Sequence, residues 1–168
     1  MKQKKALIFM RFAQDLQQLS KCKEGNVAAI IVSKNGNQVL SIGINGGAGD
    51  TRCLCAAGDK YRCIHAEVNA LAKCTSNCED AVMFCTKAPC IQCSALIINS
   101  GIKTVYYGDS YKYPQGIRML LHNGVQVYKV STLTSPNHRP HICSVVATED
   151  GYKEVLINGP DNNYFGDS

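Results

Sequence analysis

The chain has 168 residues, which fits one domain, and its 45% apolar and 18% charged residues are ordinary for a globular protein. Its formal net charge is +5, but the basic residues are scattered along the sequence. The one cluster, Lys2, Lys4 and Lys5, is too short for a nucleic-acid-binding arm. The charge is compatible with an anionic small ligand and equally with solubility alone. We therefore expect no nucleic-acid partner.

Ten cysteines are a high number for this length. The apolar run at residues 6–10 is broken by Arg11 and is too short for the apolar core of a signal peptide. No stretch approaches the roughly 18 apolar residues that a membrane span needs. We expect a cytoplasmic protein without a membrane partner, whose cysteines hold metal or are free thiols in the core.

The first part of the chain predicts a helix followed by a β-hairpin. Apolar residues at helical spacing predict an amphipathic helix over about residues 3–20. The β-branched run 27–32, the turn residues Asn35 and Gly36, and the run 39–44 predict two paired strands. A glycine-rich loop at 43–49 and an irregular segment at 50–62 follow.

Strands and helices then alternate. We predict helices at 65–73, 90–99 and 116–122, and strands at 81–86, 104–107 and 125–130. Alternation of this kind implies crossover connections and partly parallel pairing. The expected fold class is α/β, a three-layer α/β/α sandwich with a central mixed sheet of about five strands.

The tail has a different composition. Serine, threonine and proline residues mark a loop after residue 130, and the runs 145–147 and 155–157 suggest a further hairpin. We place the main domain at residues 1–130 and expect residues 131–168 to be a C-terminal extension packed on that domain.

Two short motifs carry the chemistry of the chain. His65-Ala66-Glu67 is followed about 25 residues later by Pro89-Cys90-Ile91-Gln92-Cys93. One imidazole and two thiolates can hold a zinc ion and leave its fourth position open, which distinguishes a catalytic site from a structural one. Cys90 and Cys93 are spaced i, i+3 and so share one helix face, and a helix N-terminus favours the thiolate form.

Glu67 lies next to the predicted ligands without being one of them. A zinc-activated water can attack a carbon that bears an exocyclic amine, and a carboxylate can carry the protons of that reaction. His-x-Glu followed by Pro-Cys-x-x-Cys is the arrangement typical of zinc-dependent deaminases. A structural zinc with a fourth ligand elsewhere is the alternative, because other cysteines are nearby, but such a site has no use for Glu67.

Residues of about 25–130 resemble the cytidine-deaminase superfamily, and within it the deoxycytidylate (dCMP) deaminases, including phage-type members. The resemblance rests on residues 65–71, 88–93, 96–103, 105–107 and 124–127, and on the loop 43–46. It implies a cytidine-deaminase-like fold, with residues 1–130 as a zinc-dependent deaminase domain. It also implies the reaction of dCMP with water to give dUMP and ammonia, which supplies dUMP for thymidylate synthesis.

The resemblance further implies regulation and assembly. Members of the family often form hexamers that dCTP activates and dTTP inhibits, so we expect a homo-oligomer and possible effector binding. The expected effector residues are Gly43, Asn45, Gly46 and Lys112. Ile44 stands where the family's Gly-Tyr-Asn-Gly loop has Tyr, which leaves this regulation open.

The resemblance implies the substrate contacts as well. Asn45 is expected to hold the sugar or the base, and the other expected substrate-binding residues are Asn26, Ala66, Lys23 and Tyr111. Candidate donors to a 5′-phosphate lie in regions that border the site in the family; they are Lys21, Lys23, Tyr111, Lys112 and Arg118.

The remaining cysteines suggest a second metal. Similar family members carry extra Cys and His in the loop before the His-x-Glu motif, where they hold a structural zinc. The corresponding set here is Cys53, Cys55 and Cys63, with Cys74 or Cys78 as a fourth ligand; free thiols are the alternative. We expect Cys22, Cys85 and Cys143 to be core residues.

Three functions thus remain. The first is a dCMP deaminase. The second is a deaminase of free cytidine or deoxycytidine, of a nucleic-acid base or of another amino-heterocycle. The third is a zinc-binding interaction module without catalysis. Only the third has no role for Glu67.

Overall fold

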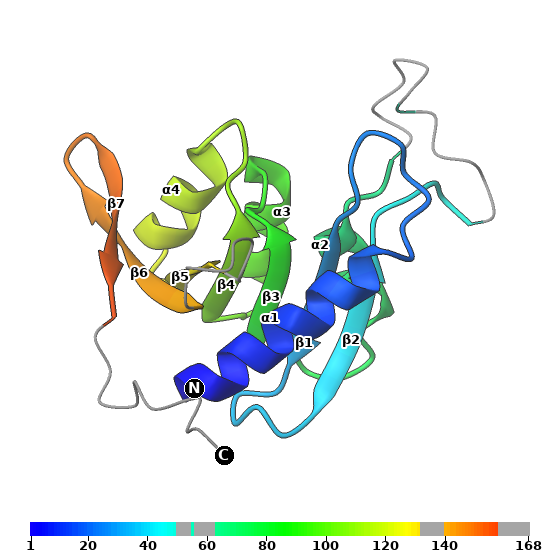
Figure 1. The fold of residues 1–168 in the computed structure, drawn as a ribbon, viewed down its shortest axis with the longest axis horizontal. Helices are drawn as coiled ribbons and strands as arrows, with labels where there is room; N and C mark the ends of the chain where they lie inside the picture. Colours follow the sequence, from blue (N-terminus) through cyan, green and yellow to red (C-terminus); the bar gives the residue numbers. More distant parts are fainter. Residues whose placement is uncertain (50–54, 56–62, 132–139, 158–168) are drawn as a thin grey trace.

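The computed structural model describes residues 1–49, 55, 63–131 and 140–157. In these ranges the chain forms one mixed sheet with helices on both faces (Figure 1). The helices are α1 (Gln3–Gln17), α2 (Ala66–Lys73), α3 (Ile91–Asn99) and α4 (Gln115–His122). The strands are β1 (Ala28–Val32), β2 (Val39–Ile44), β3 (Val82–Lys87), β4 (Thr104–Asp109), β5 (Gln126–Ser131), β6 (His141–Thr148) and β7 (Gly151–Leu156).

The sheet has the strand order β2-β1-β3-β4-β5-β6-β7. Strands β3, β4 and β5 are parallel, and every other neighbouring pair is antiparallel. The predicted α/β/α sandwich with a mixed sheet is confirmed, but the expectation of about five strands was too low. The further hairpin suggested in the tail is present as β6 and β7, and it adds two strands to the sheet because β6 pairs with β5.

Helix α1 covers one face of the sheet, and the other three helices cover the opposite face (Figure 1). On α1, Ala6, Met10 and Ala13 follow the i, i+4, i+7 pattern and are fully buried. They belong to the same core cluster as Phe84 and Tyr106. The amphipathic helix expected at 3–20 is therefore present but ends at residue 17. The buried residues that cover this face of the sheet come from α1, and none comes from α2 or α3, the helices that carry the two motifs.

Strand β1 lies at the centre of the packing between α1 and α2. All five of its residues are buried, as expected for a strand covered on both faces. Its partner β2 passes so close to α2 that a Cβ atom on Gly43 would overlap the carbonyl oxygen of Ala66 and the nitrogen of Ala70. Glycine at position 43 thus lets the hairpin press against the helix that begins at the His-x-Glu motif.

The predicted hairpin turn is present, with Gly36 at φ +68°, where glycine is favoured. The irregular segment expected at 50–62 lies outside the described residues except for Cys55. None of the helices described here has the length and apolar content needed to cross a bilayer.

Candidate metal centre and active site

The two motifs meet where the N-terminal ends of α2 and α3 come together. His65 is the N-cap of α2, Cys90 is the N-cap of α3, and Cys93 lies in the first turn of α3. The Nδ1 atom of His65 lies 3.5 Å from the Sγ atom of Cys90 and 3.4 Å from that of Cys93. Three donor atoms of the types that zinc prefers thus converge on one point, as the motif spacing predicts.

The two thiols of this group shift each other's pKa in opposite directions. The Cys93 thiol hydrogen-bonds to Cys90 and thereby lowers the pKa of Cys90 to about 4. The same hydrogen bond, together with burial, raises the pKa of Cys93 well above its ordinary value. The hydrogen bond to Cys90 also raises the pKa of His65, against the effect of burial. The opposite shifts show that ionising both thiols side by side is unfavourable here, and a divalent ion bound to both sulfurs would offset this, because metal ligation requires thiolates.

Glu67 lies in the first turn of α2 and is 3% exposed. Burial is the main reason why the pKa of its carboxyl group is raised, to about 7. A carboxyl group with a pKa near neutrality can both accept and return a proton within one reaction cycle. A buried carboxylate beside three convergent ligands, with such a pKa, matches a proton carrier better than a structural residue.

Several contacts fix the ends of these helices. The Asn69 amide on α2 donates to the carbonyl of Ile44, and Gly46 forms a two-bond bridge with Ile64, which directly precedes His65. On the other side of the site, the Ala88 backbone N–H donates to the carbonyl of Asp109 at the end of β4. The glycine loop and the segment before Cys90 are thus tied to the sheet, so the ligand positions are set by backbone hydrogen bonds.

A cavity of about 240 Å³ opens beside the ligands. It lies beyond the carboxyl ends of β3 and β4, which is where ligands bind in α/β sheets of this kind. Besides His65 and Cys90, the residues that line it include Glu24, Asn45, Ala66, Glu67, Lys87 and Tyr111. Three of the predicted substrate-binding residues, Asn45, Ala66 and Tyr111, line this cavity, and their contact with a substrate stays a prediction.

Asn45 is buried, and protein groups occupy its side chain. The amide oxygen accepts hydrogen bonds from the Ser20 hydroxyl and the Val27 backbone N–H, and the amide nitrogen donates to the Gly25 carbonyl. In this structure Asn45 positions the segment of residues 20–27 along the cavity. Its predicted contact with a substrate stays a prediction.

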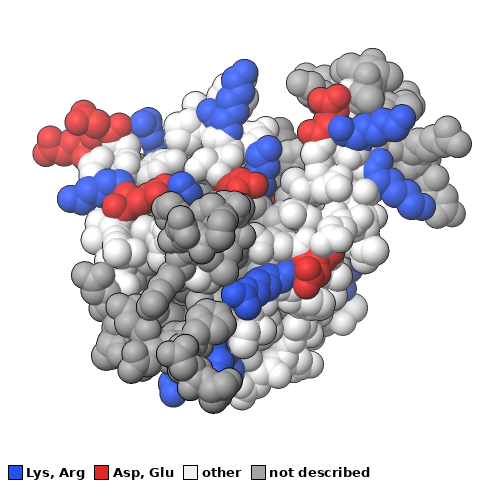
Figure 2. All heavy atoms as spheres, in the orientation of Figure 1, with Lys and Arg blue, Asp and Glu red and all other residues white. Residues whose placement is uncertain are grey.

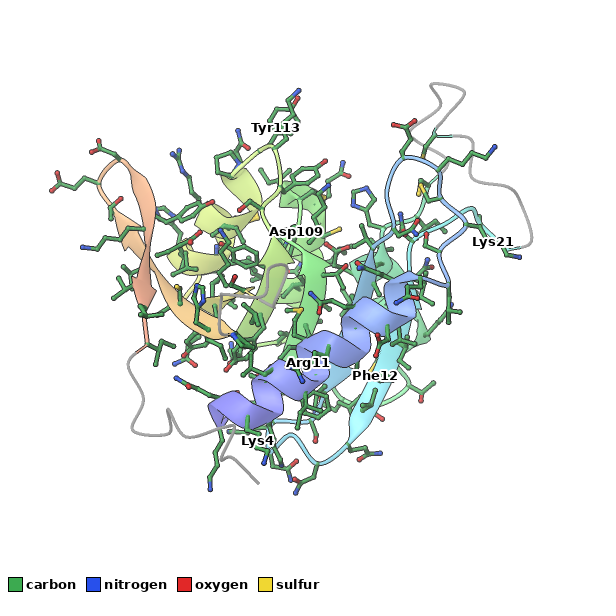
Figure 3. All side chains as sticks on the ribbon, in the orientation of Figure 1. Lys4, Arg11, Phe12, Lys21, Asp109 and Tyr113 are labelled. Carbon is green, nitrogen blue, oxygen red and sulfur yellow. The ribbon has the colours of Figure 1, made fainter. Side chains whose placement is uncertain are left out.

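The other predicted substrate contacts are less well placed. Lys23 and Asn26 are exposed and are not among the cavity-lining residues. The Lys112 amine lies over the ring of Tyr113, which projects outward from the loop after β4 (Figure 3). Arg118 donates to the Asp150 carbonyl at the β6–β7 turn, and Lys21 points outward (Figure 3). Of the candidate phosphate donors, only Tyr111 reaches the cavity.

Lys87 is the residue that the motif analysis did not single out. It is the last residue of β3 and lines the cavity, and its Nζ atom lies 5.7 Å from the centroid of the Tyr111 ring. Its position at the carboxyl end of a predicted strand, directly before Ala88-Pro89-Cys90, is a signal that points to a ligand contact.

A second group of cysteines lies along the same cavity. The sulfur atoms of Cys22, Cys55 and Cys63 all lie within 4.8 Å of one another, with Cys22 and Cys63 3.9 Å apart. The expectation that Cys22 is a core residue was incomplete, because it joins two of the three predicted ligands of a structural metal. The third, Cys53, lies outside the described residues.

Cys74 and Cys78 do not supply the fourth ligand in this arrangement. They lie beside each other, with their sulfur atoms 3.2 Å apart, after the C-terminal end of α2. Cys63 precedes the N-terminal end of the same helix, whose eight residues span about 12 Å. Cys85 is fully buried, in agreement with its expected core position, and Cys143 is partly buried on β6.

Comparison with known proteins agrees with the geometry. The model of the "Cytidine and deoxycytidylate deaminase zinc-binding region" matches residues 3–109. ComE operon protein 2 of Bacillus subtilis is 36% identical over 132 residues, which cover 73% of this chain and 69% of that protein. The deoxycytidylate deaminase of Schizosaccharomyces pombe is 34% identical over 71% of this chain, which spans only 42% of that enzyme.

A solved structure is similar as well. The dCMP deaminase from the cyanophage S-TIM5, in complex with dCMP and dUMP, superposes with a TM-score of 0.70 at 36% sequence identity, covering 77% of this chain and 98% of that one. The fold and the ligand geometry define a zinc-binding deaminase domain. The chain belongs to the cytidine and deoxycytidylate deaminase family.

Proposed function

We propose that this protein is an enzyme that hydrolyses dCMP to dUMP and ammonia. The observation that carries the proposal is the buried Glu67 carboxyl group beside the convergent set of His65, Cys90 and Cys93. The cyanophage relative bound to dCMP and dUMP supports the choice of substrate.

His65, Cys90 and Cys93 would hold the metal, for which Zn²⁺ fits best because one nitrogen and two sulfur donors converge while no carboxylate belongs to the set. Bound there, zinc would supply a Lewis acid that makes water a nucleophile at neutral pH. Glu67 would accept one proton of the attacking water and pass it to the ring nitrogen, and it would then carry the second proton, from the hydroxyl group on the attacked carbon, to the departing amine. The cavity walls hold the pyrimidine base against these groups, with the Asn45 network keeping one wall in place.

The test is ammonia release from dCMP, CMP, deoxycytidine and cytidine, measured side by side. We expect dCMP to have the highest kcat/KM. A preference for cytidine would overturn the substrate assignment in favour of the second function considered above. The absence of deamination from all four, with zinc bound, would favour an interaction module.

Two features argue against a nucleic-acid base as substrate. Lys and Arg side chains are scattered over the face seen in Figure 2 and form no continuous basic channel there. Lys87 is also the only Lys or Arg in the cavity lining, as far as the described residues show.

We also propose that the second cysteine group holds a structural zinc. Cys22, Cys55 and Cys63 would provide three thiolates, and Cys53, two residues from Cys55, is the candidate fourth ligand. Metal analysis should then give two zinc ions per chain for the natural protein and one for Cys22→Ser. One zinc per chain in the natural protein would end this proposal.

Assembly and regulation are proposed from the family resemblance. We expect a homo-oligomer, with a hexamer favoured, and exposed apolar side chains such as Ile8 on α1 and Ile91 on α3 are available for subunit contacts. Effector binding would act through the loop of Gly43 and Gly46, because Gly43 lies against α2 and Gly46 forms a bridge with Ile64, which directly precedes His65. A flat response of activity to dCTP and dTTP would exclude this regulation. We place the enzyme in the cytoplasm, where it would supply dUMP for thymidylate synthesis.

A further inference from the structure

The position of Lys87 follows from strand alternation. Met83 and Cys85 belong to the core cluster on the face of the sheet that carries α2, α3 and α4. Lys87 continues this alternation by two residues, so its side chain leaves β3 toward the same face. It lies three residues before Cys90 on a segment that a hydrogen bond ties to the end of β4. The backbone and Cβ atom of Lys87 are thus fixed in position relative to the proposed metal ligands.

The charge of Lys87 is unusual for this cavity. Two carboxylic acids, Glu24 and Glu67, line the cavity, and Lys87 is the one Lys or Arg among the described residues that does so. Apart from Lys87, the cysteines and the proposed zinc ligands, the charged side chains in the described lining are the two glutamates, which would repel an anionic ligand when ionised. Lys87 is therefore the group that can make this cavity accept a negative charge.

The Lys87 amine is available for a ligand. Among the described residues, no carboxylate lies within ion-pair distance of it, although Asp109 is its register partner on β4. The amine lies over the face of the Tyr111 ring, which lines the same cavity. A cation–π contact of this kind at a partly exposed site is weak, so a phosphate can replace it at little cost.

We infer that Lys87 binds the 5′-phosphate of the substrate and sets the preference of the enzyme for a nucleotide over a nucleoside. This inference rests on the proposed function and names the specificity-determining residue of that same site. When the base lies against Glu67 and the metal ligands, the phosphate of a mononucleotide needs a cationic partner elsewhere in the same cavity, and Lys87 is the one Lys or Arg that the described lining offers. An ammonium group binds such a dianion as a point charge with three donors.

The test compares three variants with the natural protein. Lys87→Met removes the charge and keeps an unbranched side chain, and Lys87→Arg keeps the charge. Lys103→Met is the matched control, because it removes the same charge from an exposed residue directly before β4, at the amino ends of the parallel strands and away from the cavity at their carboxyl ends. Zinc content and thermal melting establish that each variant is folded. The kinetic readouts are kcat and KM for dCMP and for deoxycytidine.

We expect Lys87→Met to lower kcat/KM for dCMP by about 10- to 100-fold, mainly through KM, since a hydrogen bond to a charged group is worth about that factor in affinity. The ratio of kcat/KM for dCMP to kcat/KM for deoxycytidine should therefore fall by the same factor. Lys87→Arg should restore most of this ratio, and Lys103→Met should leave it within about threefold of the natural value. A folded Lys87→Met variant that keeps the natural ratio, or that loses both substrates equally, would overturn the inference.

A binding measurement separates this inference from the proposed function. Calorimetric titration of the natural protein and of Lys87→Met with dUMP and with deoxyuridine requires no turnover. If the natural protein fails to deaminate dCMP, the proposed function falls, while a loss of dUMP binding in Lys87→Met still supports the phosphate contact. If the natural protein binds dUMP no more tightly than deoxyuridine, the assignment of Lys87 to the phosphate is wrong, whether or not the protein deaminates dCMP.

Discussion

Replacement of Glu67 by Gln removes the proton carrier while keeping the size and shape of the side chain. Glu67 is 3% exposed at the start of α2, and glutamine has the same number of heavy atoms, so the substitution should leave the packing around this side chain unchanged. An amide cannot accept the proton of the attacking water. We expect kcat to fall by at least about 10²–10⁴-fold, the range typical of general acid–base catalysis.

The same substitution should not destabilise the fold. Burial raises the pKa of Glu67 from 4.5 to about 7, so ionising this carboxyl group in the folded, metal-free protein costs roughly 3 kcal/mol more than in the unfolded chain. Because the folded state holds the proton more tightly, this cost is absent below about pH 4.5, grows with rising pH and is complete above about pH 7. Glutamine is neutral throughout, so metal-free Glu67→Gln should be at least as stable as the natural protein, with the difference largest at alkaline pH.

The assay is ammonia release from dCMP by the zinc-loaded proteins, with zinc content measured on the same samples. Denaturant unfolding with chelator at pH 5 and pH 8 gives the stability of the metal-free forms. The expected pattern is full zinc content, an intact fold and activity close to background. Activity within tenfold of the natural protein would refute the proton-carrier role of Glu67, and a large loss of stability at both pH values would refute the argument from burial.

Three further variants test other parts of the structure. Cys90→Ser should lose most of the catalytic zinc and of the activity while staying folded, as metal analysis and circular dichroism would show; full zinc content would contradict the assigned ligand set. Gly43→Ala should lower the free energy of unfolding by about 1–3 kcal/mol, measured from the denaturant midpoint, because the added Cβ atom meets the backbone of α2. An unchanged midpoint would contradict this close approach of β2 and α2. Ser94→Ala should be neutral or stabilising in thermal melting, because the Ser94 hydroxyl is buried without a hydrogen-bond partner among the described residues; a clear drop in melting temperature would reveal a partner.

The pattern of elements could be read from the sequence because it depends on local periodicity. The helix at the start of the chain, the hairpin around Gly36 and the alternating strands and helices all lie within a few residues of their predicted bounds. The tail was harder to interpret. Its strands β6 and β7 have mostly exposed or half-buried residues, so they lack the strong hydrophobic alternation of a strand in the core, and pairing with β5 is what adds them to the sheet.

The sequence by itself determined which residues are the candidates for metal ligands and proton carrier. His65, Glu67, Cys90 and Cys93 belong to two short motifs at helix starts, where the spacing along the helix already sets which side chains share a face. Only the tertiary structure decided what surrounds them. Cys22 joins Cys55 and Cys63 from a segment 41 residues before Cys63, and the charge of Lys87 meets the cavity because β3 ends beside it. Such contacts depend on how strands and loops pack across the sheet, and no local spacing encodes that.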